Sequence, residues 1–500
     1  MLPEHLNIDD YLLRQRLTEG KGERVALRLD DRDVTYAELD RAASGFAALL
    51  AERGVGPRDR VLIVMPDGMA DAAALFGVLR LGSVALLLNP GMTPGDIGGI
   101  AGMARATAAV VHKRHQDHFD RALAGAGVTA PPQIVADGTL TIPDVDVPTF
   151  GTGARDPAMW IFSGGTTGLP KAVVQTHRSF ANTTELYGKG TLGLTEDDIT
   201  IAVPKLYFGY AMGSNLFFPF SVGASAVLFE EHPTPDAVFD RIDRHRATVL
   251  VNVPSAINQM LSRETNRDLS TLRVVTSAGE ALPDTLYNRW RERFGVELLD
   301  GLGTAEMWHI FVSNRIGDVR PGTLGRVVPG FEIKVCDEEG DEVPTGEVGR
   351  LWVRGDSLGL GYFENPVATA EAFRGDWFAG GDLVSVDDEG YVTHRGRADD
   401  AIKVKGRWFR PQEVESTLLD HPAVSECAVV AVSDAAGLAI PVAFVVADDV
   451  TEQELIDWVL SRLEPYKHPR RIHFIATLPQ THLGKVDRGA LKAMAPPPPT

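Results

Sequence analysis

Short, unbroken runs of apolar residues alternate in this chain with segments rich in alanine and leucine. Residues 60–65, Arg-Val-Leu-Ile-Val-Met, predict a buried strand, and residues 70–81 predict a helix packed on it. A strand whose residues are all apolar is typically covered by helices on both faces of its sheet. The same pattern recurs in part at 108–111, 225–229 and 248–253. The sequence therefore predicts an α/β fold built on mixed, mostly parallel sheets.

The character of the sequence changes along the chain. A connection rich in Pro, Asp and Gly around residues 135–157 predicts a surface excursion between two sheet subdomains. From about residue 321, short strands separated by turns predict a small β-barrel or a distorted sheet. After residues 396–400, Gly-Arg-Ala-Asp-Asp, a compact α+β module is expected. Its elements are a helix over 411–420, a strand over 428–432, a helix over 451–463 and a strand over 471–475.

Composition limits the partners. The 500 residues include 49 Lys and Arg against 68 Asp and Glu, a net charge of −19, so a nucleic-acid partner is not expected and any polyanionic ligand needs cations of its own site. Cys336 and Cys427 lie too far apart in sequence to indicate a metal site or a disulfide framework. No secretory signal and no apolar window of about 18 residues is present, so we expect a cytoplasmic protein with no membrane partner.

Residues 161–172, Ile-Phe-Ser-Gly-Gly-Thr-Thr-Gly-Leu-Pro-Lys-Ala, place a loop rich in glycine and hydroxyl groups directly after an apolar strand. Hydroxyls donate to phosphate oxygens, and glycines let backbone N–H groups approach an anion without interference from a Cβ atom. The spacing is neither that of the P-loop nor that of the dinucleotide fingerprint. The pattern indicates a phosphate-binding loop, with a surface turn bearing a solvated lysine as the alternative. The candidate ligands are Ser163, Gly164, Gly165, Thr166, Thr167, Gly168 and Lys171.

This loop resembles the signature loop of the adenylate-forming superfamily, which includes acyl-CoA synthetases, carrier-protein adenylation domains and luciferases. It departs from that pattern at Gly164, where a second hydroxyl residue is usual, and at Ala172, where glycine is usual. Four further segments resemble superfamily motifs in the same order along the chain. They are residues 277–283, 300–306, 377–382 and 478–488.

The first two of these segments imply the adenine and phosphate contacts. Residues 277–283, Ser-Ala-Gly-Glu-Ala-Leu-Pro, resemble the stretch whose backbone lines the adenine pocket, and a helix N-terminus with a capping acid is a compatible alternative. In residues 300–306, Asp-Gly-Leu-Gly-Thr-Ala-Glu, the resemblance implies that Thr304 holds a phosphate and that Glu306 helps to hold Mg²⁺. Thr304 stands one residue before the usual threonine position, which Ala305 occupies. The nucleotide-binding residues implied are Gly279, Glu280, Ala281, Asp300 and Gly301.

The last two segments imply the ribose and catalytic contacts. Asp382, in Trp-Phe-Ala-Gly-Gly-Asp, matches the aspartate that accepts both ribose hydroxyls, and Arg397 matches the arginine beside it. A simple turn is the alternative for this segment. Lys485, in the segment 478–488, matches the lysine that bridges the acid and the α-phosphate, where a cation stabilises charge in the transition state.

Three stretches narrow the resemblance to benzoate-CoA ligase-like aryl-CoA synthetases: residues 205–215, 221–228 and 306–314. By position, Gly209, Tyr210 and His309 line the aryl site. Glycine leaves room for a flat ring, tyrosine supplies an aromatic wall with a polar tip, and histidine could hydrogen-bond a carboxylate or a ring substituent. Core packing is the alternative for the aromatic residues in 205–215.

The resemblance implies a large N-terminal domain over residues 1–398, with α/β subdomains over about 1–150 and 151–320 and a β-barrel subdomain over 321–398. A small mobile α+β domain over 399–500 would follow a hinge near Asp399. Rotation of this domain would withdraw Lys485 and present Gly406 to the thiol of coenzyme A. A basic rim would then hold the phosphates of coenzyme A, with a solvated charged turn as the alternative: Lys403, Lys405, Arg407 and Arg410.

The activity implied is that of an AMP-forming acid-thiol ligase that uses ATP, Mg²⁺ and coenzyme A. Its substrate would be a benzoate-type acid, with hydroxy- and amino-substituted benzoates as candidates. Two alternatives stay open within the superfamily: an aryl-AMP ligase that loads a carrier protein, and an enzyme that passes the adenylate to another nucleophile or activates nitrite. A nucleotide-binding relative without catalysis is a third alternative, prompted by Gly164 and Ala305.

Overall fold

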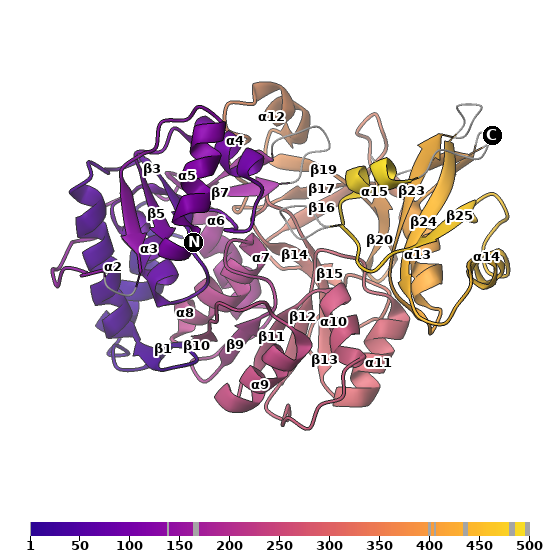
Figure 1. Cartoon of the computed structure of the whole chain (residues 1–500), viewed down its shortest axis with the longest axis horizontal. Coiled ribbons are helices and arrows are strands. Elements are labelled where there is room, and N and C mark those ends of the chain that lie inside the picture. Colours follow the sequence, from indigo (N-terminus) through magenta and orange to yellow (C-terminus); the bar gives the residue numbers. More distant parts are fainter. Residues whose placement is uncertain are drawn as a thin grey trace.

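The computed structural model describes residues 2–137, 140–163, 170–398, 402–404, 407–433, 439–479 and 486–495. In these residues the strands form two large sheets, a five-stranded sheet and two small C-terminal sheets. Figure 1 shows the two large sheets, surrounded by helices, at one end of the long axis and the C-terminal strands at the other end.

The first large sheet has six strands in the order β6-β5-β3-β4-β7-β8. Its strands pair in parallel except β7 with β8, which form an antiparallel hairpin. The predicted strand and helix at 60–81 are confirmed as β3 and α3. The strands are β3 (Arg60–Val64), β4 (Val84–Leu87), β5 (Ala108–His112), β6 (Gln133–Ala136), β7 (Pro157–Ser163) and β8 (Lys171–Thr176), and the helices are α2 (Tyr36–Ala51), α3 (Met69–Arg80), α4 (Pro94–Ala104), η2 (Lys113–His115) and α5 (Gln116–Gly125).

The second large sheet has nine strands in the order β15-β14-β13-β12-β11-β9-β10-β1-β2, with a parallel centre and antiparallel pairs at both edges. The strands are β1 (Val25–Arg28), β2 (Asp33–Thr35), β9 (Ile199–Ala202), β10 (Ser225–Val227), β11 (Val249–Asn252), β12 (Val274–Ser277), β13 (Glu297–Gly303), β14 (Ile310–Ser313) and β15 (Arg326–Val327). The helices of this part are η1 (Asp10–Arg14), α1 (Gln15–Thr18), α6 (His177–Thr183), η3 (Thr184–Lys189), α7 (Gly209–Met212), η4 (Gly213–Phe217), α8 (Phe218–Val222), α9 (Pro235–His245), α10 (Pro254–Leu261) and α11 (Asp284–Phe294).

A five-stranded antiparallel sheet follows in the sequence. Its order is β16-β17-β19-β18, with β20 paired to the other part of β19. The sequence predicted a small β-barrel or a distorted sheet. The pairing order of the described strands does not close on itself, which corresponds to a distorted sheet. Its elements are β16 (Glu332–Cys336), β17 (Gly349–Arg354), α12 (Pro366–Ala372), β18 (Phe373–Arg374), β19 (Trp377–Val386) and β20 (Val392–Arg397).

The C-terminal module contains the predicted helices and strands. Its strand β23 is longer than predicted because it pairs along its whole length with β24. The module meets the large part of the protein where Asn258 Nδ2 donates to Ser425 O (2.7 Å) and Thr285 Oγ1 donates to Asp420 Oδ1 (2.9 Å). Its elements are β21 (Ile402–Val404), β22 (Arg407–Phe409), α13 (Pro411–Leu419), β23 (Val424–Ser433), β24 (Ala439–Ala447), α14 (Glu452–Leu460), β25 (Arg471–Phe474) and α15 (Arg488–Met494).

A buried ion network fastens the N-terminal segment to the first sheet. The Arg80 guanidinium donates to Asp9 Oδ2 (3.0 Å) and Asp40 Oδ1 (2.5 Å), and the side chains of Arg80 and Asp9 are fully buried. Local signals place the neighbouring helix, because Thr35 and Glu38 form a capping box at the start of α2. In the part of the chain that the structure describes, no helix is long and apolar enough to cross a bilayer.

Candidate active site

The ends of the predicted phosphate loop lie side by side. β7 ends at Ser163 and β8 begins at Lys171, and these two residues are register partners in the antiparallel hairpin. The Lys171 ammonium lies 4.9 Å from the centroid of the Tyr362 ring. The loop residues Gly164, Gly165, Thr166, Thr167 and Gly168 lie outside the described residues, so their contacts with phosphate stay a prediction.

Glu306 is buried and oriented by a phenol. Tyr362 Oη donates to Glu306 Oε1 at 2.7 Å, and only 6% of Glu306 is exposed. Thr304 Oγ1 accepts from Met307 N (3.3 Å), so its hydroxyl closes the turn and can still donate its own proton. Among the described residues, no three His, Cys, Asp or Glu side chains gather into a metal site. A cation here would be bound by one carboxylate together with phosphate oxygens and water, which is the usual way that Mg²⁺ binds.

Asp300 is a buried carboxyl in the middle of β13. It is the register partner of Ser277 on β12. Burial raises its pKa well above the usual range, although the Ser277 hydroxyl and the Gly301 amide partly offset this effect. Within the described chain its Oδ1 atom has no hydrogen-bond partner. The structure therefore provides a buried carboxyl group with one unpaired oxygen where the sequence predicted a nucleotide pocket.

Glu280 caps a helix, but not the one that follows it. Its carboxylate accepts from Ser255 N (2.9 Å) and Ser255 Oγ (3.0 Å), at the first turn of α10. The alternative from sequence, a helix N-terminus with a capping acid, is therefore only partly correct: Glu280 is a capping acid, but it caps α10 and not α11, the helix that follows its own segment. Gly279 and Ala281 are exposed, and Gly279 has φ of +89°. Their backbone is accessible to a ligand, as the predicted adenine contact requires.

The predicted ribose residues are brought together across two strands. Asp382 and Arg397 are register partners on β19 and β20, and Arg397 Nη1 donates to Asp382 Oδ1 at 3.4 Å. His394 Nε2 lies 3.2 Å from the same oxygen. His394 was not predicted from sequence, because only the pairing of β20 with β19 brings its side chain to Asp382.

Tyr210 and His309 lie together, as the resemblance implied, with ring centroids 5.3 Å apart. His309 Nε2 is 2.9 Å from Tyr210 O, and since a carbonyl only accepts, Nε2 carries the proton. Ile310 N donates to His309 Nδ1 at 2.8 Å. Burial lowers the His309 pKa to about 3, so the ring is neutral. Both ring nitrogens are already bonded within the protein, so neither is free for the hydrogen bond to a substrate considered from sequence.

Close packing holds the His309 imidazole in place. The ring centroid of Phe218 is 4.7 Å away, that of Trp308 is 5.4 Å away, and that of Tyr187 is 5.6 Å away. Gly213 leaves the space that the imidazole fills, because a Cβ atom there would lie 2.4 Å from His309 Cδ2. Trp308 has φ of +63°, a left-handed conformation that is costly for a bulky residue.

Tyr210 is anchored by its hydroxyl, which donates to Thr276 Oγ1 at 2.7 Å. Its ring is half-buried, and Gly209 beside it begins α7. A methyl group at Gly209 would lie 3.5 Å from Ile161 Cγ2, an ordinary contact. The two residues therefore present a ring face and a bare backbone at the predicted aryl site.

The predicted catalytic and thiol-transfer residues are only partly described. Lys485, the hinge residue Asp399, Gly406 and Lys405 lie outside the described residues. Lys403 and Arg407 belong to β21 and β22, which pair in antiparallel fashion. Arg410 precedes α13, and burial lowers the pKa of its guanidinium.

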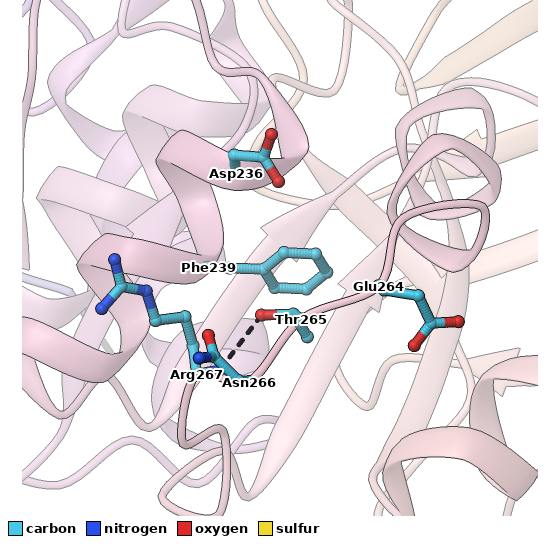
Figure 2. Close-up of a pocket in the computed structure, with 6 residues that line it drawn as sticks. All are labelled: Asp236, Phe239, Glu264, Thr265, Asn266 and Arg267. Carbon is cyan, nitrogen blue, oxygen red and sulfur yellow. Dashed lines mark hydrogen bonds between the residues drawn. The ribbon is translucent and has the colours of Figure 1, made fainter.

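A separate surface hollow of about 540 Å³ lies between α9 and the loop after α10 (Figure 2). Arg267 N donates to Thr265 Oγ1 within its rim (3.2 Å). None of its lining residues was predicted to bind nucleotide or acid. They are Asp236, Phe239, Glu264, Thr265, Asn266 and Arg267.

Comparisons with known proteins identify the family of the chain. Residues 14–363 match the AMP-binding enzyme family, and residues 413–485 match the AMP-binding enzyme C-terminal domain. The chain is 38% identical to a benzoate–CoA ligase of Thauera aromatica (98% of this chain, 97% of the relative) and 32% identical to a p-hydroxybenzoic acid–AMP ligase of Mycobacterium tuberculosis (98% and 69%). The structure of an anthranilate CoA ligase in complex with anthranoyl-AMP superposes with a TM-score of 0.93 at 34% identity, covering 99% of this chain and 98% of that one. The chain therefore belongs to the family of AMP-binding enzymes, the adenylate-forming superfamily that its motifs resemble.

Proposed function

We propose that the chain joins an aromatic carboxylic acid to coenzyme A through an acyl adenylate, at the expense of ATP. One observation carries the proposal. β13 and the turn after it bear Asp300, Thr304, Glu306 and His309. The residues predicted to bind the nucleotide and the histidine predicted to line the aryl site therefore belong to one continuous segment. An acid bound against His309 would have its carboxylate beside the α-phosphate.

The first step needs no nucleophile from the protein. A carboxylate oxygen of the acid attacks the α-phosphorus of ATP, a new C–O–P linkage forms, and pyrophosphate leaves. The protein contributes position and charge. Asp382 would hold the ribose, Lys171 would face phosphate oxygens, and Glu306 would bind Mg²⁺, which neutralises phosphate charge when bound.

In the second step the thiol of coenzyme A loses its proton and attacks the acyl carbon, and AMP leaves. The superposition on an anthranilate CoA ligase and the identity with a benzoate–CoA ligase support this acceptor. The ring surfaces of Tyr210 and His309 favour a flat aromatic acid over an aliphatic one. ATP and coenzyme A are intracellular metabolites, and we infer that the reaction takes place in the cytoplasm.

A second candidate acceptor is a carrier protein, because the chain is also 32% identical to a p-hydroxybenzoic acid–AMP ligase. The two functions share the first step and differ only in the acceptor. AMP release with coenzyme A or with a holo-carrier protein as the only varied partner separates them.

The test measures pyrophosphate release from ATP with benzoate, hydroxybenzoates and aminobenzoates, followed by thioester formation. Lys485→Ala should slow adenylate formation by about a hundredfold or more, because charge stabilisation is lost, while sparing thioester formation from supplied acyl adenylate. Absence of acid-dependent pyrophosphate release in the wild type would refute the function. An equal loss of both half-reactions in Lys485→Ala would refute the role of the lysine.

A further inference from the structure

Residues 359–363 form a loop that is bonded to both halves of the predicted phosphate site. Gly359 N donates to Glu306 O (2.9 Å), and Leu360 N donates to Val174 O (2.9 Å) on β8, the strand that begins at Lys171. The same strand also donates to the loop, because Val174 N is hydrogen-bonded to Gly361 O (3.0 Å). The loop therefore connects the strand that carries the lysine to the turn that carries the glutamate.

Tyr362 projects from this loop between the two charged groups. Its hydroxyl donates to Glu306 Oε1 (2.7 Å), and the Lys171 ammonium lies 4.9 Å from its ring centroid. Phe373 packs edge-on against the ring at 5.4 Å, and Tyr362 N donates to Thr369 Oγ1 (3.0 Å). The residue is 8% exposed, so the ring has little freedom to turn.

We propose that Tyr362 is a positioning residue for the nucleotide half-reaction: its hydroxyl orients the Glu306 carboxylate for a divalent cation, and its ring face holds the Lys171 ammonium for phosphate. The inference rests on the proposed function. It assigns a role to a residue of the connecting loop, outside the motifs from which the site was predicted.

A hydrogen bond on Oε1 fixes the rotation of the carboxylate before the cation arrives, and pre-oriented ligands bind more tightly than free ones. A lysine over an aromatic face is attracted by the ring and stays near it without forming a full ion pair with the glutamate beyond. A phenol carries its proton at neutral pH, so the Tyr362 hydroxyl acts as the donor to Glu306.

The two roles can be separated by substitution. Tyr362→Phe removes the hydroxyl and keeps the ring under Lys171, whereas Tyr362→Leu removes both. Tyr391→Phe is a matched control, because Tyr391 Oη likewise donates to a carboxylate, that of Asp318, which is not among the predicted site residues. Two readouts are measured for each variant: the Mg²⁺ concentration for half-maximal pyrophosphate release, and ATP affinity by calorimetry without acid, with and without Mg²⁺.

Tyr362→Phe should raise the half-saturating Mg²⁺ concentration about tenfold, the effect of losing a hydrogen bond to a charged group, and saturating Mg²⁺ should restore kcat. Its ATP affinity without Mg²⁺ should stay at the wild-type value. Tyr362→Leu should in addition lower the affinity for ATP without Mg²⁺ by about threefold, since the cation–π contact with Lys171 is lost. Tyr391→Phe should change none of these values.

The double variant Glu306→Gln/Tyr362→Phe guards against a folding defect, since it leaves no charged carboxylate without its donor. Its Mg²⁺ dependence should equal that of Glu306→Gln alone. The inference is overturned if Tyr362→Phe has the same half-saturating Mg²⁺ concentration as an active wild type. It is also overturned if kcat of Tyr362→Phe stays below the wild-type value at every Mg²⁺ concentration. A wild type without ATP-dependent pyrophosphate release refutes the proposed function itself.

Discussion

Gly213→Ala tests whether the packing around His309 forms the acid pocket. Gly213 begins η4 in a right-handed helical conformation, so alanine fits its backbone. The added Cβ atom would lie 2.4 Å from His309 Cδ2, 2.7 Å from Nε2 and 3.0 Å from Phe218 Cζ. Contacts below 3.0 Å essentially do not occur, so the imidazole must move by about 1 Å.

The cost follows from what the imidazole loses. Overpacking a close-fitted site costs about 1–3 kcal/mol. The bond from His309 Nε2 to Tyr210 O, now 2.9 Å, stretches or breaks, which adds about 1 kcal/mol. If the displaced ring intrudes on the acid, kcat/KM for the acid should fall by about 10- to 100-fold, because 1.4 kcal/mol corresponds to a factor of ten.

The assay compares kcat/KM for the acid with KM for ATP in pyrophosphate release. Gly98→Ala is the control, because its Cβ atom would lie 2.6 Å from Ala126 Cβ and 2.7 Å from Ala122 O, a similar clash between α4 and α5. Both variants should lower the melting temperature, and only Gly213→Ala should lower kcat/KM for the acid. An unchanged kcat/KM for the acid in a folded Gly213→Ala protein would show that His309 lies outside the pocket.

Three further substitutions probe charge. Asp382→Asn keeps the shape of the predicted ribose acceptor but removes its charge. KM for ATP should therefore rise about tenfold, while KM for the acid stays unchanged. An unaltered KM for ATP would mean that the ribose binds elsewhere. Arg80→Met leaves Asp9 and Asp40 without their buried cation and should cost about 3–5 kcal/mol in denaturant unfolding, whereas a loss under 1 kcal/mol would contradict the buried network. Burial raises the Asp67 pKa to about 6, so the folded state holds this proton more tightly than the unfolded chain and its stabilising effect is lost as pH rises from about 4 through 6. Asp67→Asn should therefore gain up to about 3 kcal/mol relative to wild type between pH 4 and 7, and a pH-independent difference would rule the shift out.

Elements with a strong local pattern were predicted well from sequence. The apolar run at β3 and the alanine-rich α3 need only their own periodicity, and the structure confirms both within one residue at each end. β23 was predicted too short, because Glu426 and its neighbours break the apolar run. Its true length, Val424–Ser433, comes from pairing with β24. A strand end set by a partner strand cannot be read from local sequence.

The motifs identified the adenylate-forming family because each motif is a contiguous run of residues. The sequence alone thus determined the family, the α/β architecture and the segments expected to hold nucleotide and acid. It could not determine the partners of individual side chains.

Those partners were decided by tertiary structure. Glu280 caps α10, which precedes it in sequence, and His394 reaches Asp382 only through the register of β19 and β20. Both ring nitrogens of His309 form hydrogen bonds with the backbone of Tyr210 and Ile310. Tyr362, from a loop distant in sequence, donates a hydrogen bond to Glu306. Periodicity and propensity act over a few residues, whereas these contacts join groups that only the packing of whole sheets and loops brings within hydrogen-bond distance.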